Sequence, residues 1–253
     1  MKRILAGNWK MNLLLGEARA LYDEVSAGCG SLARVVCVVF PPAVALAPLA
    51  AARREGTPAL GAQNCHFETK GAFTGEISAE QARDSGARYA LVGHSERRRL
   101  FCESDSVARQ KLLAAWRAGL HPVLCVGETL AERERRETRD VLARQLRRAL
   151  EGAPPKAPLW VAYEPVWAIG TGVVASVEEV AEAHAWVGEE VASVRSGADP
   201  VPILYGGSVD PKNAGPLAAT PGVDGFLVGG ASLKAESFLA IGGCLERAAP
   251  ARG

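Results

Sequence analysis

The sequence carries almost no excess charge, and its cysteines form no recognisable motif. Its 29 basic and 28 acidic residues leave a net charge of +1, which predicts neither a nucleic-acid partner nor binding to a membrane surface. Its six cysteines are scattered, without a CxxC pair or a cluster with histidine, so we expect no metal site and no disulfide framework. In a chain of 253 residues they indicate reduced thiols in a cytoplasmic protein.

Long apolar runs are also scarce. The start, MKRILAG, has too short an apolar run for a secretory signal peptide. Residues 35–52 contain no charge and approach the length of a membrane span. However, Pro41, Pro42 and Pro48 would each remove a backbone donor within it. A strand, VVCVVF, followed by a helix explains this stretch better.

Eight short apolar runs recur along the chain, with helical patterns between them. Most are continuous rather than alternating, which is typical of strands buried on both faces of a parallel sheet. The runs lie near residue 4 and at 35–40, 59–64, 89–94, 122–127, 159–164, 202–207 and 225–230.

Two stretches show the apolar period of helices: SVARQKLLAAWRAG at 106–119 and RETRDVLARQLRRALEG at 136–152. In the second, Val141, Leu142 and Leu146 share one face. Its arginines alternate with acids at helical spacing, which favours a solvated face over a nucleic-acid stripe.

Eight strand–helix units in about 250 residues, with no linker between them, predict one α/β domain over 1–253, a (β/α)8 barrel. The alternative is a doubly wound open sheet. Such a sheet usually has a glycine-rich turn after its first strand, whereas NWKMN follows the first run here. The barrel is therefore the better interpretation.

In a barrel, the loops that follow the strands form the functional site. Asn8 and Lys10 follow the first run, Gln63 and Asn64 the third, His94 the fourth, and Glu164 ends the sixth. Taken singly, each has an ordinary explanation as a surface, solvated or packed residue. Together they predict a carboxylate, an imidazole and an ammonium group at one end of the barrel.

His94 precedes SERR, where Ser95 has the pattern of a helix start. The positive end of a helix dipole favours a neutral imidazole. A neutral ring can donate a hydrogen bond to a carbonyl without being a strong acid. This pattern favours a hydrogen-bond donor to a carbonyl, with a packed core histidine as the alternative.

Glycine pairs follow the last two runs, in GGS at 206–208 and GG at 229–230. Glycines allow backbone N–H groups to approach an anion closely, and barrels commonly hold a phosphate between these two loops. Ser208 adds a hydroxyl, and Lys10 supplies a compact charge opposite. A phosphorylated substrate is therefore expected.

The loop after Glu164 is unusually long. Pro165 keeps Glu164 extended, and a capping box of Ser176 and Glu179 predicts that the next helix begins near Val177. An ordinary connection would be shorter and more polar, so the loop is interpreted as a lid. Its apolar and glycine residues are Val166, Trp167, Ile169, Gly170 and Gly172.

Six motifs occur along the chain: AGNWKMN, GHSERR, CVGET, AYEPVWAIGTG, YGGSV and FLVGGASLK. Taken together, they resemble the motifs of the triosephosphate isomerase family in order and spacing. The resemblance extends to about Lys234 and weakens towards the C-terminus. It implies a TIM barrel that interconverts dihydroxyacetone phosphate and D-glyceraldehyde 3-phosphate as an isomerase, with no cofactor or metal.

The resemblance also implies a role for each site residue. Glu164 matches the general base and His94 the neutral electrophile. Lys10 and Asn8 match the pair that contacts substrate, and Glu96 matches a position that supports the lysine. The residues that match the phosphate grip are Gly170, Ser208, Gly229 and Gly230.

The stretch CHFETKGAFTGEIS at 65–78 is similar to a loop that reaches into a partner subunit in the family, so Thr74 and Glu76 imply a homodimer. An independent surface loop is the alternative. Cys102 departs from the family pattern, since it stands where the family usually has glycine. The lid also departs, because Val173, Val174 and Ala175 replace the usual lysine-threonine-alanine.

Two other functions compete with isomerisation. One is an aldolase that forms a Schiff base at Lys10, although the later predicted strands carry no lysine. The other is a catalytically inactive barrel that binds a partner. The complete set of Asn8, Lys10, His94 and Glu164 argues against it.

Overall fold

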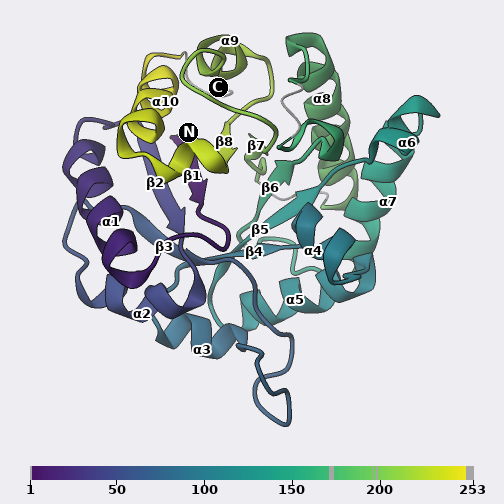
Figure 1. Ribbon diagram of the computed structural model, residues 1–253. Coiled ribbons are helices and arrows are strands. Elements are labelled where there is room, and N and C mark those ends of the chain that lie inside the picture. Colours follow the sequence, from purple (N-terminus) through teal and green to yellow (C-terminus); the bar gives the residue numbers. More distant parts are fainter. Residues whose placement is uncertain (1, 171–173, 196, 198, 249–253) are drawn as a thin grey trace.

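The computed structural model describes residues 2–170, 174–195, 197 and 199–248. Eight parallel strands, β1 to β8, pair in sequence order and close into a barrel (Figure 1). β1 pairs with both β2 and β8, so the first and last strands are neighbours. The predicted (β/α)8 barrel is therefore confirmed, and the doubly wound open sheet is excluded.

Several strands are shorter than the apolar runs that predicted them. The runs ending at residues 64, 94, 207 and 230 continue two residues beyond the last residue of their strands. These extra residues lie in the loops above the barrel, where the candidate site is. The strands are β1 (Arg3–Asn8), β2 (Val35–Phe40), β3 (Ala59–Ala62), β4 (Tyr89–Val92), β5 (His121–Val126), β6 (Trp160–Tyr163), β7 (Ile203–Tyr205) and β8 (Gly225–Val228).

Helices surround the barrel (Figure 1). They include α1 (Leu15–Cys29), α2 (Ala43–Ala51), α3 (Ala79–Asp84), α4 (Ser95–Leu100), α5 (Asp105–Arg117), α6 (Leu130–Glu134), α7 (Thr138–Leu150), α8 (Val177–Val194), α9 (Ala214–Ala219) and α10 (Ala235–Arg247), with 3-10 turns η1 (Val166–Ala168) and η2 (Gly230–Leu233). The uncharged stretch at 35–52 forms β2 and α2, as predicted. Within the described ranges, no helix has both the length and the apolarity needed to cross a membrane.

Strand side chains alternate between two cores. Leu5 points outwards into the layer shared with the helices, whereas its neighbours Ile4 and Ala6 point into the barrel. The interior is filled by side chains, as in a packed core rather than a pore. It contains Ile4, Ala6, Val38, Phe40, Leu91, Val123, Cys125, Trp160, Ala162, Leu204 and Leu227.

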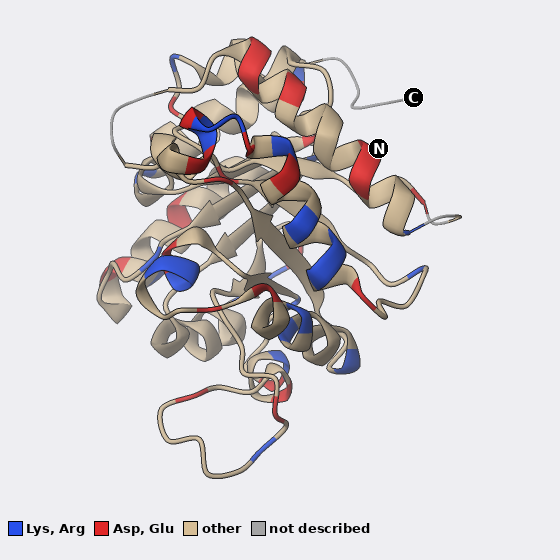
Figure 2. Cartoon of the chain, turned by 90° about the vertical axis from the view of Figure 1, so that its right-hand side faces the viewer, with Lys and Arg blue, Asp and Glu red and all other residues tan. Residues whose placement is uncertain are grey.

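The charged face of α7 is solvated and ion-paired, as its sequence pattern predicts. Val141, Leu142 and Leu146 are buried, while Arg139 and Arg147 form ion pairs with glutamates of α8. Basic and acidic residues are interspersed along the helices on this side of the molecule (Figure 2). The pairing leaves no continuous basic stripe on α7.

A buried ion pair joins α5 to the loops around it. Lys111 of α5 is 3% exposed, and its ammonium contacts the carboxylate of Glu103 and the side-chain oxygen of Asn64. Burial raises the pKa of Glu103, but its hydrogen bonds with Lys111 and Arg97 outweigh this and lower the pKa below its ordinary value. The carboxylate is therefore ionised at neutral pH.

Substitution of Lys111 by methionine should destabilise the protein by up to about 3–5 kcal/mol, because it removes the buried partner of Glu103 and leaves its charge with Arg97 alone. Urea denaturation at neutral pH measures the effect. The matched control is Arg139→Met, which breaks a surface ion pair and should cost less than about 1 kcal/mol. Equal losses in the two variants would contradict the role given to the buried pair.

Candidate active site

Four of the polar residues predicted at the strand ends, Asn8, Lys10, His94 and Glu164, line one cavity of about 370 Å³. They come from different strands, and barrel closure places them around the same opening. The lining includes Asn8, Lys10, His94, Glu164, Gly170, Gly206, Gly207, Ser208, Gly229 and Gly230, with Ile169, Val174 and Leu227 as apolar wall. Gln63, Asn64 and Glu96, which the sequence analysis also named, border the adjoining cavity instead.

Glu164 follows β6 directly and is almost completely buried, with 2% of its surface exposed. Its backbone N–H donates to the Val126 carbonyl at 2.7 Å, which ties it to the end of β5. Two neighbouring positions require glycine. A Cβ atom at Gly127 would lie 1.7 Å from the Glu164 carbonyl oxygen, and one at Gly206 would lie 2.9 Å from its Cγ atom. These glycines make room for the acid.

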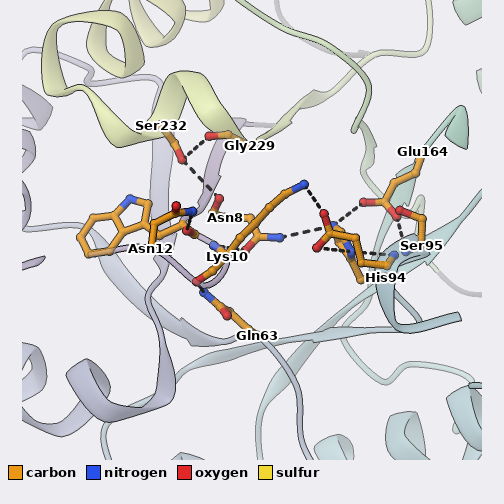
Figure 3. Close-up of polar contacts among 11 residues, drawn as sticks. Asn8, Lys10, Asn12, Gln63, His94, Ser95, Glu164, Gly229 and Ser232 are labelled. Atoms are coloured by element: carbon orange, nitrogen blue, oxygen red, sulfur yellow. Dashed lines mark hydrogen bonds and ion pairs between the residues drawn. The ribbon is translucent and has the colours of Figure 1, made fainter. Parts of the chain in front are cut away.

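The Glu164 carboxylate has two polar partners (Figure 3). Its Oε1 atom lies 3.0 Å from His94 Nε2, and its Oε2 atom accepts a hydrogen bond of 2.9 Å from the backbone N–H of Ser95. Burial raises the pKa of Glu164, but His94 and the Ser95 N–H outweigh it and lower the pKa below its ordinary value. The site therefore holds an ionised carboxylate away from water.

His94 is the N-cap of α4, and its Nδ1 atom accepts a hydrogen bond of 3.2 Å from the backbone N–H of Glu96. An unprotonated Nδ1 leaves the ring proton on Nε2, which faces Glu164. Burial lowers the pKa of His94, but the carboxylates of Glu164 and Glu96 outweigh it and raise the pKa. The helix start therefore sets the tautomer, which the sequence analysis did not address, whereas the carboxylates of Glu164 and Glu96 raise the pKa of the ring that was expected to be neutral.

Lys10 approaches the same place from the end of β1 (Figure 3). Its ammonium lies 2.5 Å from Glu96 Oε1, so the residue expected beside the lysine is in contact with it. Asn8 Nδ2 lies 3.3 Å from His94 Nε2, and Asn8 Oδ1 accepts a hydrogen bond from the Lys10 backbone N–H. Lys10 itself has φ of +51°, in the left-handed region that favours glycine.

The glycine turn after β7 lies beside Glu164, and the turn after β8 lies beside Lys10, which the sequence analysis had placed opposite these turns. A Cβ atom at Gly229 would come within 3.5 Å of Lys10 Cε, so the ammonium stem packs against this turn. The Ser208 hydroxyl donates to the Ala168 carbonyl at 2.6 Å. It therefore contacts the loop after β6, a contact that the sequence did not predict.

The base of that loop is held by a buried acid. Glu128 is fully buried and accepts hydrogen bonds from Trp167 Nε1 at 2.7 Å and from the Tyr163 hydroxyl at 3.2 Å. Burial raises the pKa of Glu128. Gly170 has φ of +69°, as a turn requires. The predicted lid residues Gly172 and Val173 lie outside the described residues.

Other sequence expectations are met at the edges of the loop. Ser176 and Glu179 form the predicted capping box, and α8 begins at Val177. Val174 is exposed, while Ala175 is buried.

Cys102 is exposed and has φ of +54°, which explains why glycine suits this position.

Two contributors to the site were missed from sequence. The backbone N–H of Ser95 carries no side-chain signal, and only the predicted helix start at this residue hinted at a free donor. Glu128 follows a strand in CVGET and could not be told from a surface acid there. Gln63 was noticed at a strand end without a role, although it contacts the Lys10 backbone at 2.8 Å.

The arrangement is suited to moving a proton. An ionised, buried carboxylate, an imidazole N–H and an ammonium group surround a cavity that ends in glycine turns. Such a set can remove a proton beside a carbonyl and stabilise the oxyanion that forms. Among the described residues, no group of three histidine, cysteine or acidic side chains is placed to hold a metal ion.

Comparisons with known proteins agree on one family. A family model described as triosephosphate isomerase matches residues 3–244. The chain is 50% identical over 243 residues to triosephosphate isomerase of Stenotrophomonas maltophilia, covering 95% of this chain and 96% of that one. It is 46% identical over 246 residues to the enzyme of Afipia carboxidovorans, covering 95% and 96%. A crystal structure of triosephosphate isomerase from Bartonella henselae matches with a TM-score of 0.88 and 41% identity, covering 98% and 100%.

Replacement of His94 by leucine should raise the pKa of Glu164. The carboxylate would lose the partner that favours its charge, while the burial that disfavours it remains. Carboxyl ¹³C NMR of labelled glutamate measures the titration, with exposed Glu182 as internal reference. An unchanged or lower pKa would show that His94 does not hold the charge of Glu164.

Proposed function

The chain belongs to the triosephosphate isomerase family and interconverts dihydroxyacetone phosphate and D-glyceraldehyde 3-phosphate, and we propose that Glu164 is the base that moves the proton. The observation that carries this proposal is the buried contact between Glu164 and His94, 3.0 Å across the cavity. The reaction belongs to glycolysis and, in reverse, to gluconeogenesis.

In the proposed mechanism, the Glu164 carboxylate removes a proton from the carbon beside the substrate carbonyl. The pKa of this carboxyl group is lowered, so the base is ionised at neutral pH. Its hydrogen bond with the Ser95 N–H breaks when the carboxylate turns towards substrate. Glu164 then returns the proton to the neighbouring carbon, which completes the isomerisation.

His94 donates from Nε2 to the substrate oxygens in this scheme. The hydrogen bond from the Glu96 N–H to Nδ1 supports a neutral ring with its proton on Nε2. A substrate placed between His94 and Glu164 separates the ring from the carboxylate that raises its pKa. Burial and the helix N-terminus then favour the neutral form. Lys10 and Asn8 contact the same oxygens, and the Lys10 ammonium stabilises the enediolate.

The phosphate of the substrate binds between Gly170, Ser208, Gly229 and Gly230, with Lys10 beside Gly229. Support comes from the shared cavity and from the packing of Lys10 against Gly229. The loop after Glu164 closes over the phosphate, and its closure excludes water from the enediolate. The Ser208 hydroxyl already contacts the start of this loop at Ala168.

An aldolase mechanism fits the surroundings of Lys10 less well. A Schiff base requires an uncharged amine as nucleophile, whereas the Lys10 ammonium is in an ion pair with Glu96 at 2.5 Å. Exposure to borohydride together with triose phosphate should leave no adduct on Lys10. The cation serves as an electrostatic partner in the proposed reaction.

We also propose that the protein is a cytoplasmic homodimer. All six cysteines carry free thiols, which suits a reducing compartment. The 65–78 loop projects from the body of the molecule (Figure 1), and its Phe73 and Ile77 are exposed. Beside it lies a cavity of about 710 Å³. It is lined by Asn8, Lys10, Met11, Asn12, Gln63, Glu96, Arg97, Leu100 and Phe101, among others.

The occupant proposed for this cavity is the same loop of a second copy. Met11, Leu100 and Phe101 are highly exposed apolar side chains along the cavity, and the loop carries apolar residues of its own. Burial of these apolar side chains against a partner subunit explains their exposure in the single chain better than an independent surface loop does. Thr74 and Glu76 then lie near the partner subunit's Lys10 and Glu96.

Substitution of Glu164 by glutamine should lower kcat by about 10³-fold or more, because the amide keeps the shape of the side chain but cannot take up the proton. A coupled assay on triose phosphate measures the rate, and thermal unfolding checks the fold. Glu182→Gln, an exposed carboxylate on α8, is the matched control and should be unchanged. A near-normal rate in Glu164→Gln would remove it as the base.

Substitution of Phe73 by aspartate should convert the dimer to a monomer in sedimentation experiments, because a charge would be buried in the proposed interface. Val194→Asp changes an exposed apolar residue at the end of α8 and should leave the dimer intact. A wild-type protein that sediments as an active monomer would contradict the dimer.

A further inference from the structure

Lys10 has an unusual backbone for a residue with a long side chain. Its φ of +51° lies in the left-handed region, which L-residues with a Cβ atom rarely adopt. This conformation decides where the ammonium goes, since the Cβ direction follows from the backbone. A backbone held in a disfavoured conformation requires partners that keep it there.

Two side-chain amides hold the Lys10 backbone, one on each side (Figure 3). Asn8 Oδ1 accepts from the Lys10 N–H at 3.0 Å. On the other side, Gln63 Nε2 donates to the Lys10 carbonyl at 2.8 Å. Both hydrogen bonds run from the strand ends to a loop residue that no strand pairing restrains.

Gln63 also contacts the end of a second strand. Its Nε2 atom donates to the Phe40 carbonyl at 2.9 Å, so one amide group links Lys10 with the last residue of β2. The two N–H bonds of a primary amide can serve the two carbonyls at once. The Trp9 N–H donates to the same Phe40 carbonyl at 3.1 Å. The loop after β1 is thereby fixed to the end of β2.

We propose that Gln63 is a positioning residue that holds the Lys10 backbone in its left-handed conformation and so aims the ammonium at the substrate. The inference rests on the proposed function, in which Lys10 contacts the phosphorylated substrate. Gln63 itself touches no reacting atom. It acts through the carbonyl of Lys10.

Asn64, the next residue after β3, does not share the positioning role proposed for Gln63. Asn64 Oδ1 accepts from Lys111 Nζ at 2.7 Å, on the side of the helices. Gln63 therefore lies on the side of the site, and Asn64 supports the buried ion pair. Their side chains point to opposite partners, as successive residues of an extended chain do.

The test is a double-mutant cycle between Gln63 and Lys10. Gln63→Met keeps the length of the side chain and removes both donors, while Lys10→Met removes the ammonium. Binding of inorganic phosphate is measured for the wild type, both single variants and the double variant, because it can be followed when turnover is lost. Thermal unfolding and sedimentation check the fold of each protein.

Gln63→Met should weaken phosphate binding and lower kcat/KM by about 10- to 100-fold, because a small misplacement of a positioning group is costly. In the Lys10→Met background, the same change should alter phosphate binding by less than about twofold. Equal losses in both backgrounds, or no loss in the wild-type background, would overturn the inference. No effect of Lys10→Met itself would instead overturn the proposed role of Lys10.

Gln63→Glu gives an independent readout if the methionine variant does not fold. An ionised glutamate has no donor and places negative charge beside two carbonyls, whereas a protonated one regains a single donor. The kcat/KM of this variant, relative to wild type at the same pH, should therefore recover as the pH falls. A ratio that does not change with pH would contradict the positioning role.

Discussion

The contact between the Glu164 carboxylate and the His94 imidazole is the interaction on which the rest of the site depends. A carboxylate that is 2% exposed suffers a large desolvation penalty. The His94 ring and the Ser95 N–H offset it and keep the charge. An isomerase that works through proton transfer needs this combination, because a buried, ionised base reacts without competition from water.

That contact requires the barrel around it. Glu164 can lie where it does only because Gly127 and Gly206 leave room for its backbone and side chain. The start of α4 supplies the Ser95 donor and sets the His94 tautomer through the Glu96 N–H. Each of these elements belongs to a different strand–loop unit, so the site exists only in the closed structure. Stability of the barrel and function of the site are therefore linked through the same strand ends.

The charges across the cavity form a chain rather than isolated groups. Glu96 contacts Lys10 and donates its backbone N–H to His94, and His94 in turn contacts Glu164. Gln63 and Asn8 hold the Lys10 backbone from both sides. A change at one member should alter the pKa or position of its neighbour, which is why the effects of substitutions here should not add.

Local sequence determined the fold class, the order of the elements and which residues stand at the strand ends. The spacing of apolar residues and the length of each apolar run indicate whether a segment is a strand or a helix. The number of strand–helix units then favours a barrel. The Ser176 capping box and the helix start at Ser95 were readable for the same reason. Only the tertiary structure decided that Glu164 meets His94, that Gln63 holds Lys10, and that Ser208 and Glu128 contact the loop after β6. These are contacts between residues far apart in the chain, and barrel closure and strand register set their distances, which no local pattern encodes.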